Sequence, residues 1–115
     1  MTLKILHNPR CSKSRQTLQI LQDQGLEPVV IDYLKTPITE EELVDILNQL
    51  KLSPRDLLRK GEKIYKELEL SNKGIDDKQL HRHMIENPIL IERPIVLSDK
   101  GARIGRPPES VLEII

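Results

Sequence analysis

Apolar runs and helical patterns alternate in the first third of the chain. Residues 3–6 form a short apolar run typical of a buried strand, and residues 28–32 form a second strand rich in β-branched side chains. Between them, leucines recur at helical spacing in residues 14–21, and Gly25 is a natural C-cap. A strand, a helix and a strand within about 30 residues have the size of a right-handed βαβ unit with parallel strands.

The middle of the chain carries helical patterns bounded by start and stop signals. Thr39 and Glu42 form a capping box, and Ser53 precedes a proline at the first position of a helix. That second helix is expected to stop at Gly61. The predicted helices cover residues 40–50, 54–60, 62–70 and 76–86. We therefore expect an all-helical insert at about residues 39–87.

A β-hairpin follows the insert. Apolar runs at residues 93–97 and 102–105 flank a polar turn that contains a glycine, and a final helix is expected to open at residues 106–109. The order βαβ, helices, ββα predicts a thioredoxin-like α/β fold, with a four-stranded mixed sheet flanked by helices, in a single domain of residues 1–115. In such a fold the proline before the third strand is commonly cis and faces the active cysteine, so we expect a cis bond at Pro94.

Cys11 lies where the first predicted strand turns into a helix. The free N–H groups and the positive dipole end of a helix start favour a thiolate, and they also favour a bound oxyanion. Arg10 and Lys13 add positive charge, which lowers the pKa of a thiol. We therefore interpret Cys11 as a reactive thiol; the alternative is an inert buried side chain. His7 either activates this thiolate or ends the strand as a polar surface residue.

A single cysteine limits the chemistry that the chain can perform. No internal disulfide is possible, and Ser14 occupies the last position of what would otherwise be a C-x-x-C motif. Redox chemistry at Cys11 therefore needs thiols from other molecules. We expect no metal site, because a second cysteine is absent and because His81 and His83, two positions apart, point to different faces of their helix.

The composition argues against several classes of partner. Lys and Arg together number 18, as do Asp and Glu, and two tyrosines are the only aromatic residues, so we expect no nucleic-acid partner. No apolar stretch reaches membrane-spanning length, and the N-terminus lacks the pattern of a secretion signal. We therefore expect no membrane association and a cytoplasmic location.

Two arginines, Arg93 and Arg106, stand directly before prolines at the two ends of the predicted hairpin. A residue before proline is held extended, so each guanidinium leaves the backbone in a restricted direction. Planar guanidinium groups suit tetrahedral oxyanions because they bind two oxygens at once. From spacing alone, the alternative of two ordinary surface arginines is the simpler interpretation.

Four separated motifs span essentially the whole chain. They are His7-Asn8-Pro9-x-Cys11-x-x-Ser14-Arg15, Leu57-Leu58-Arg59-Lys60, Asn87-Pro88-Ile89-Leu90-Ile91-x-Arg93-Pro94-Ile95-Val96 and Arg106-Pro107-Pro108-Glu109-x-Val111-Leu112-Glu113-Ile114. Together they resemble the glutaredoxin-dependent arsenate reductase family, whose members are ArsC-like proteins of the thioredoxin-like superfamily. The residues around the cysteine, Arg10 before it and Ser12-Lys13 after it, resemble a housekeeping branch of that family.

The resemblance implies a function and a set of site residues. It implies that Cys11 is the nucleophile that attacks arsenate, and that Arg59, Arg93 and Arg106 bind arsenate and the arsenylated intermediate. Arg59 has no feature of its own that singles it out, so its role rests on the resemblance. Glutathione as a co-substrate and glutaredoxin as a protein partner would supply the two outside thiols and release arsenite, an activity used in arsenic detoxification. No bound cofactor is implied.

The resemblance also gives roles to two neighbours of the cysteine. His7 matches the family residue thought to favour the thiolate, and Ser14 would form a hydrogen bond to the sulfur that lowers the pKa of the thiol. Two other functions compete with this interpretation. One is a glutathione-dependent protein thiol reductase that uses Cys11 on protein mixed disulfides. The other is a non-catalytic regulator that binds RNA polymerase, although such regulators usually carry the second cysteine that Ser14 replaces.

Overall fold

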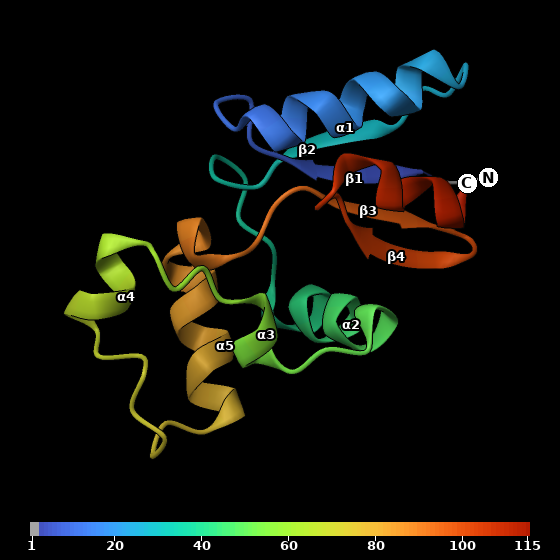
Figure 1. The fold of residues 1–115 in the computed structure, drawn as a ribbon. Helices are drawn as coiled ribbons and strands as arrows, with labels where there is room; N and C mark the ends of the chain where they lie inside the picture. The colour runs from blue at the N-terminus through green and yellow to red at the C-terminus, as the bar shows by residue number, and fades with distance from the viewer. Residues whose placement is uncertain (1–2) are drawn as a thin grey trace. The chain divides into compact units, whose positions relative to one another are not determined.

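The computed structural model describes residues 3–115 (Figure 1). Met1 and Thr2, the first positions of the predicted domain, lie outside the described residues. The chain divides into two compact units. One consists of the segment that ends at Thr36 together with Arg93–Ile115, and we call it the sheet unit. The other, Pro37–Glu92, we call the helical unit.

The sheet unit is built around four short strands (Figure 1). These are β1 (Lys4–His7), β2 (Val29–Asp32), β3 (Ile95–Ser98) and β4 (Gly101–Ile104). The spatial order is β2-β1-β3-β4, in which β1 and β2 are parallel and the other two pairs are antiparallel. This four-stranded mixed sheet with its flanking helices confirms the α/β, thioredoxin-like arrangement expected from the sequence.

One face of this sheet carries an apolar core. Helix α1 (Ser12–Asp23) and the C-terminal 3₁₀ helix η2 (Pro108–Ile114) both contribute to it. Its buried members are Leu3, Ile5, Leu21, Val96, Val111 and Ile114. Burying each such side chain stabilises the fold by roughly 1.5–3 kcal/mol before conformational entropy is counted. Because side chains alternate along a strand, His7 lies on the same face of β1 as Ile5 and therefore faces α1.

The helical unit contains the expected series of short helices. They are α2 (Glu40–Leu50), α3 (Pro54–Leu57), α4 (Lys63–Glu67), α5 (Asp77–Glu86) and the 3₁₀ turn η1 (Pro88–Leu90). The capping box predicted before α2 is present, because the Thr39 hydroxyl accepts from the Glu42 N–H and the Glu42 carboxylate accepts from the Thr39 N–H. Helix α5 packs against α2 and α3 within the unit.

The second helix of this unit is shorter than expected. We predicted that it would run to Gly61, but α3 ends at Leu57 and the next residue pairs with Ile91 in a short antiparallel bridge. The Arg59 N–H donates to the carbonyl of Leu90 at 2.7 Å, in the same short pairing. This non-local pairing takes the backbone groups that a longer helix would have used, and a local pattern does not reveal it.

The final helix has a tighter type than an α-helix. Its buried residues are Pro108, Val111 and Ile114, spaced by three, and the 3₁₀ helix places positions three apart on one line. Leu112 lies off this line, and its side chain is 42% exposed. None of the helices within residues 3–115 has the length and apolar character needed to cross a bilayer.

Candidate active site

The topology of the sheet unit brings distant segments to one edge. Strand β1 ends, β3 begins and β4 ends at the same side of the sheet, because Leu6 pairs with Ile95 and Ile95 pairs with Ile104. The loop to α1 leaves from this edge, and Cys11 occupies the N-cap position of that helix. The Arg93–Pro94 and Arg106–Pro107 bonds at this edge are both cis.

Cys11 is a free, partly exposed thiol. Burial raises the pKa of the thiol. This effect is outweighed by hydrogen bonds from the Ser14 N–H, the Arg93 side chain and the Lys13 N–H, and by the charge of Arg106. The pKa of the thiol is therefore below its usual value. The two backbone donors belong to the first turn of α1, where N–H groups have no partner within the helix. The helix start therefore stabilises the thiolate directly.

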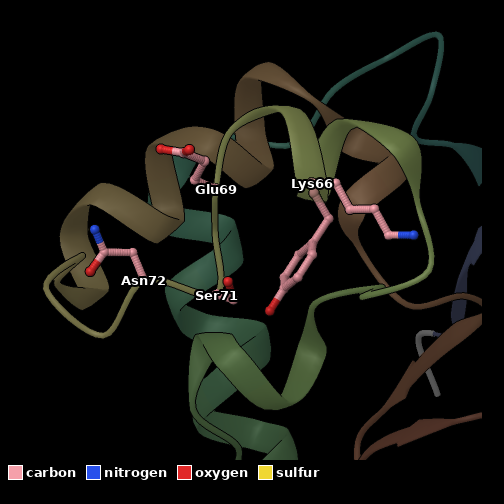
Figure 2. A pocket seen from close by; sticks show the side chains of 5 residues that line it. Lys66, Glu69, Ser71 and Asn72 are labelled. Carbon is pink, nitrogen blue, oxygen red and sulfur yellow. The ribbon is translucent and has the colours of Figure 1, made fainter.

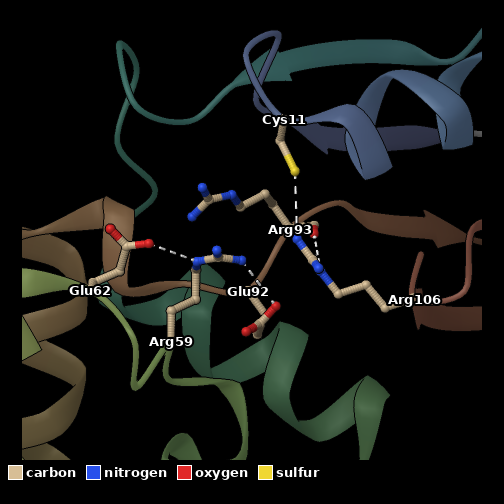
Figure 3. Close-up of polar contacts among 6 residues, drawn as sticks. All are labelled: Cys11, Arg59, Glu62, Glu92, Arg93 and Arg106. Carbon is tan, nitrogen blue, oxygen red and sulfur yellow. Dashed lines mark hydrogen bonds and ion pairs between the residues drawn. The ribbon is translucent and has the colours of Figure 1, made fainter.

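Two arginines at the ends of the hairpin act on the sulfur, and Figure 3 shows the contact that Arg106 makes with it. An Nη2 of Arg106 donates to the Sγ of Cys11 at 3.5 Å, across 95 positions of sequence, and its Nε donates to the carbonyl of Arg93 at 2.9 Å. The Arg93 side chain, which is only 9% exposed, also contributes to the lowered pKa of the thiol. Two permanent positive charges at a nucleophilic sulfur form a site that can hold an oxyanion beside it.

His7 and Ser14 form a buried pair next to the cysteine. The Nδ1 of His7 lies 2.6 Å from the Oγ of Ser14, which also accepts from the Asn8 N–H at 3.0 Å. We expected Ser14 to bond to the sulfur, and its backbone N–H is the group that does so. The hydroxyl is directed to the imidazole instead, because α1 places the fully buried Ser14 side chain against the sheet face that carries His7.

A carboxylate that the sequence analysis did not single out stands beside His7. Asp32 is its register partner on the parallel strand β2. Burial lowers the pKa of His7, the Asp32 charge raises it and the charge of Arg15 lowers it, with a net lowering. The Oδ1 of Asp32 is buried with no hydrogen-bond partner. The pairing of the two strand ends is the one signal that could have identified Asp32.

Arg59 belongs to the helical unit. Its Nε contacts the Oε2 of Glu62 at 3.1 Å and its Nη1 contacts the Oε2 of Glu92 at 3.4 Å (Figure 3). The position of Glu62, three residues after Arg59, is readable from the sequence. Glu92 is not, because its approach depends on the bridge between Leu58 and Ile91.

The helical unit also carries a pocket that none of the predicted site residues lines. Figure 2 shows a pocket in the helical unit that is lined by Tyr65, Lys66, Glu69, Ser71 and Asn72; its volume is about 400 Å³. Within residues 3–115, no three His, Cys, Asp or Glu side chains are grouped so that they could hold a metal ion. The side chains with a clear chemical arrangement are those around Cys11.

The fold and this site define a thioredoxin-like protein whose single cysteine lies at a helix start, with two arginines that lower the pKa of its thiol. Residues 6–114 match the model of the ArsC family. The chain belongs to that family.

Individual relatives cover nearly the whole chain. "Arsenate reductase" of Escherichia coli K12 is 45% identical over 113 residues, which are 98% of this chain and 80% of the relative. "Uncharacterized protein YfgD" of the same strain is 51% identical over 114 residues, or 98% and 96% of the two chains. The solved structure "Arsenate reductase from Vibrio cholerae" superimposes with a TM-score of 0.97 at 50% identity and covers 100% of this chain and 98% of that one.

Proposed function

We propose that this protein is an arsenate reductase, an oxidoreductase that reduces arsenate to arsenite with electrons from glutathione and glutaredoxin. The observation that carries the proposal is the position of Cys11 at the start of α1 with Arg106 in contact with its sulfur, where these groups and the Arg93 side chain lower the pKa of the thiol. Relatives named arsenate reductase at 45% identity support the choice of oxyanion.

The first step uses the groups around Cys11. Its thiolate attacks the arsenic atom, a sulfur–arsenic bond forms, and one arsenate oxygen leaves as water after taking up a proton. Arg93 and Arg106 hold the remaining oxygens, whose negative charge they offset with charge-assisted hydrogen bonds worth about 1.5–3 kcal/mol each. We assign Arg59 to the same anion on the strength of the family resemblance. His7 and Ser14 act on this step by orienting the first turn of α1 that donates to the sulfur.

The reducing electrons come from outside the chain. A glutathione thiolate replaces a second oxygen on arsenic, and that oxygen also leaves as water. A glutaredoxin thiolate then attacks the glutathione sulfur, and a mixed disulfide between glutaredoxin and glutathione forms. The bond between the glutathione sulfur and arsenic breaks with its electron pair on arsenic, which becomes As(III) and stays bonded to Cys11. Water releases arsenite and restores Cys11. Because this cycle needs reduced thiols, it also favours the cytoplasm, where thiols are kept reduced.

A second candidate is a glutathione-dependent protein thiol reductase that uses the same Cys11. The thiol chemistry would be alike, but a protein mixed disulfide has no tetrahedral oxyanion at the atom that the thiolate attacks, where Arg93 and Arg106 could bind it. These two arginines therefore favour arsenate.

The test is a coupled assay that follows NADPH consumption with glutathione reductase, glutathione, glutaredoxin and arsenate. We expect turnover by the wild type that is lost in Cys11→Ser and when glutaredoxin is omitted. Arsenate reduction by Cys11→Ser would contradict the nucleophile, and full turnover without glutaredoxin would contradict the external-thiol cycle. Turnover with a glutathionylated protein but none with arsenate would favour the second candidate.

A further inference from the structure

The side chain of Arg59 is already occupied by two carboxylates. Glu62 lies 3.1 Å from its Nε and Glu92 lies 3.4 Å from its Nη1 (Figure 3). The exposed fractions of the three side chains are 21%, 23% and 25%, so all three are largely shielded from water. Ion pairs in such partly buried positions are screened less than those on the open surface.

Both carboxylates contact the one guanidinium of Arg59. An anion that approaches these faces of Arg59 therefore meets a like charge at each contact and has to displace a carboxylate to take its place. The two contacts also use Nε and Nη1, two donor positions of the guanidinium that could otherwise face an oxyanion. Glu62 and Glu92 are thus internal ligands of the arginine.

We propose that Glu62 and Glu92 determine the anion affinity of Arg59 by competing with the oxyanion for its guanidinium. This inference rests on the proposed function, which assigns Arg59 to arsenate binding. In this role the two glutamates allow Arg59 to bind only an anion that can displace a carboxylate. Anions that accept hydrogen bonds weakly do not displace the glutamates. A stronger anionic acceptor takes the place of Glu62 or Glu92 and binds Arg59.

The alternative is that the glutamates only orient the arginine. The two roles predict opposite effects of replacing glutamate by glutamine, because glutamine keeps a side-chain oxygen that accepts a hydrogen bond but removes the charge. If the glutamates orient Arg59, glutamine leaves anion binding equal or weaker. If they compete with the anion, glutamine makes anion binding tighter.

The experiment measures arsenate binding by titration calorimetry in the Cys11→Ser background, in which the covalent step cannot occur. We expect the added pair Glu62→Gln and Glu92→Gln to tighten binding about tenfold, as removal of a competing charged partner should. Glu67→Gln is the matched control, because Glu67 pairs with the exposed Lys63 at 3.7 Å on the adjoining helix and does not touch Arg59. The gain should also disappear when Arg59 is replaced by Ala.

Unchanged or weaker binding in the double variant would overturn the proposal, as would an equal gain in Glu67→Gln or a gain that survives Arg59→Ala.

A second measurement separates this proposal from the proposed function. Phenylglyoxal labelling of Arg59, followed by peptide mass spectrometry, should be several-fold faster in the double variant than in the control whether or not arsenate binds. Faster labelling without arsenate binding would support competition by the glutamates and refute the assignment of arsenate as the substrate. Arsenate binding with unchanged labelling and affinity would support the assignment of arsenate and refute the competition.

Discussion

At the scale of single residues, the reactivity of Cys11 depends on which groups donate to its sulfur. Two backbone N–H groups and two guanidinium groups together outweigh the cost of partial burial. The backbone donors cannot be removed by substitution, whereas the arginines can. Arg93 is the more buried of the two arginines, so its substitution tests a side chain that solvent screens little. A lysine at this position would keep the charge but not the planar guanidinium.

Replacement of Arg93 by Lys should weaken arsenate binding about tenfold or more, because lysine cannot hold two oxygens in one plane. Equilibrium binding to the Cys11→Ser protein measures this effect without the chemical step. Arg10→Lys, at an exposed arginine beside the cysteine, is the control and should leave the affinity unchanged. An unchanged affinity in Arg93→Lys would refute the two-oxygen contact.

Asp32 provides a second prediction at this scale. Its charge raises the pKa of His7 against the larger effect of burial, so Asp32→Asn should lower the pKa of His7 further. NMR titration of the His7 ring proton, assigned with a His7→Gln variant, measures the change. Asp23→Asn, at the far end of α1, should leave the His7 titration where it is. A pKa of His7 that rises or stays constant in Asp32→Asn would contradict the electrostatic pairing.

These residues also show what could be read from the sequence and what could not. The place of Cys11 at a helix start followed from the change of pattern around it, and that position explains much of its chemistry. The direction of the Ser14 side chain did not follow, because it depends on which face of α1 meets β1. Asp32 and Glu92 were missed because their partners lie on other strands or segments.

At the scale of elements, local signals predicted the helix starts well and the helix ends less well. The capping box at Thr39 consists of groups within four residues and is visible in the sequence. The end of α3 depends on a bridge to a segment more than 30 positions away, which no local pattern records. The type of η2 is likewise set by the way its residues meet the core rather than by intrinsic propensity.

Gly105 connects three elements of the sheet unit. Its N–H donates to the Pro94 carbonyl at 2.9 Å, and a Cβ at this position would collide with Thr17 of α1 and with the Pro94 ring, 2.7 Å away. The glycine thus permits close packing of β4, α1 and the segment that leads into β3. Pro94 directly follows Arg93 and Gly105 directly precedes Arg106, so this packing helps to hold both arginines beside Cys11.

Replacement of Gly105 by Ala should lower the free energy of unfolding by roughly 1–3 kcal/mol, the usual cost of overpacking a tight site. Chemical denaturation measures it. Gly61→Ala is the control, since a Cβ there meets no atom within 4 Å, and it should change stability much less. Equal stability of the two variants would show that the site near Thr17 has room to relax.

At the scale of the whole molecule, the arrangement of the sheet explains why motifs far apart in the sequence act together. Pairing of β1 with β3 and of β3 with β4 places residues 7–11, 93–94 and 105–106 at one edge. From the order of strands and helices we predicted a thioredoxin-like fold, in which the proline before the third strand faces the cysteine. The two compact units of the folded chain meet at two boundaries in the sequence. One lies between Thr36 and Pro37 and the other between Glu92 and Arg93.

We propose that Cys11 is a nucleophile whose pKa is lowered within an oxyanion site. Because it is the only cysteine, the rate of alkylation by iodoacetamide reports on it alone. A lowered pKa means that the thiolate forms at lower pH, so the rate should reach half its maximum at a lower pH than it does for an unperturbed cysteine thiol measured alongside. Arsenate should slow the reaction by occupying the site. A midpoint at or above that of a free thiol, with no protection by arsenate, would contradict the account.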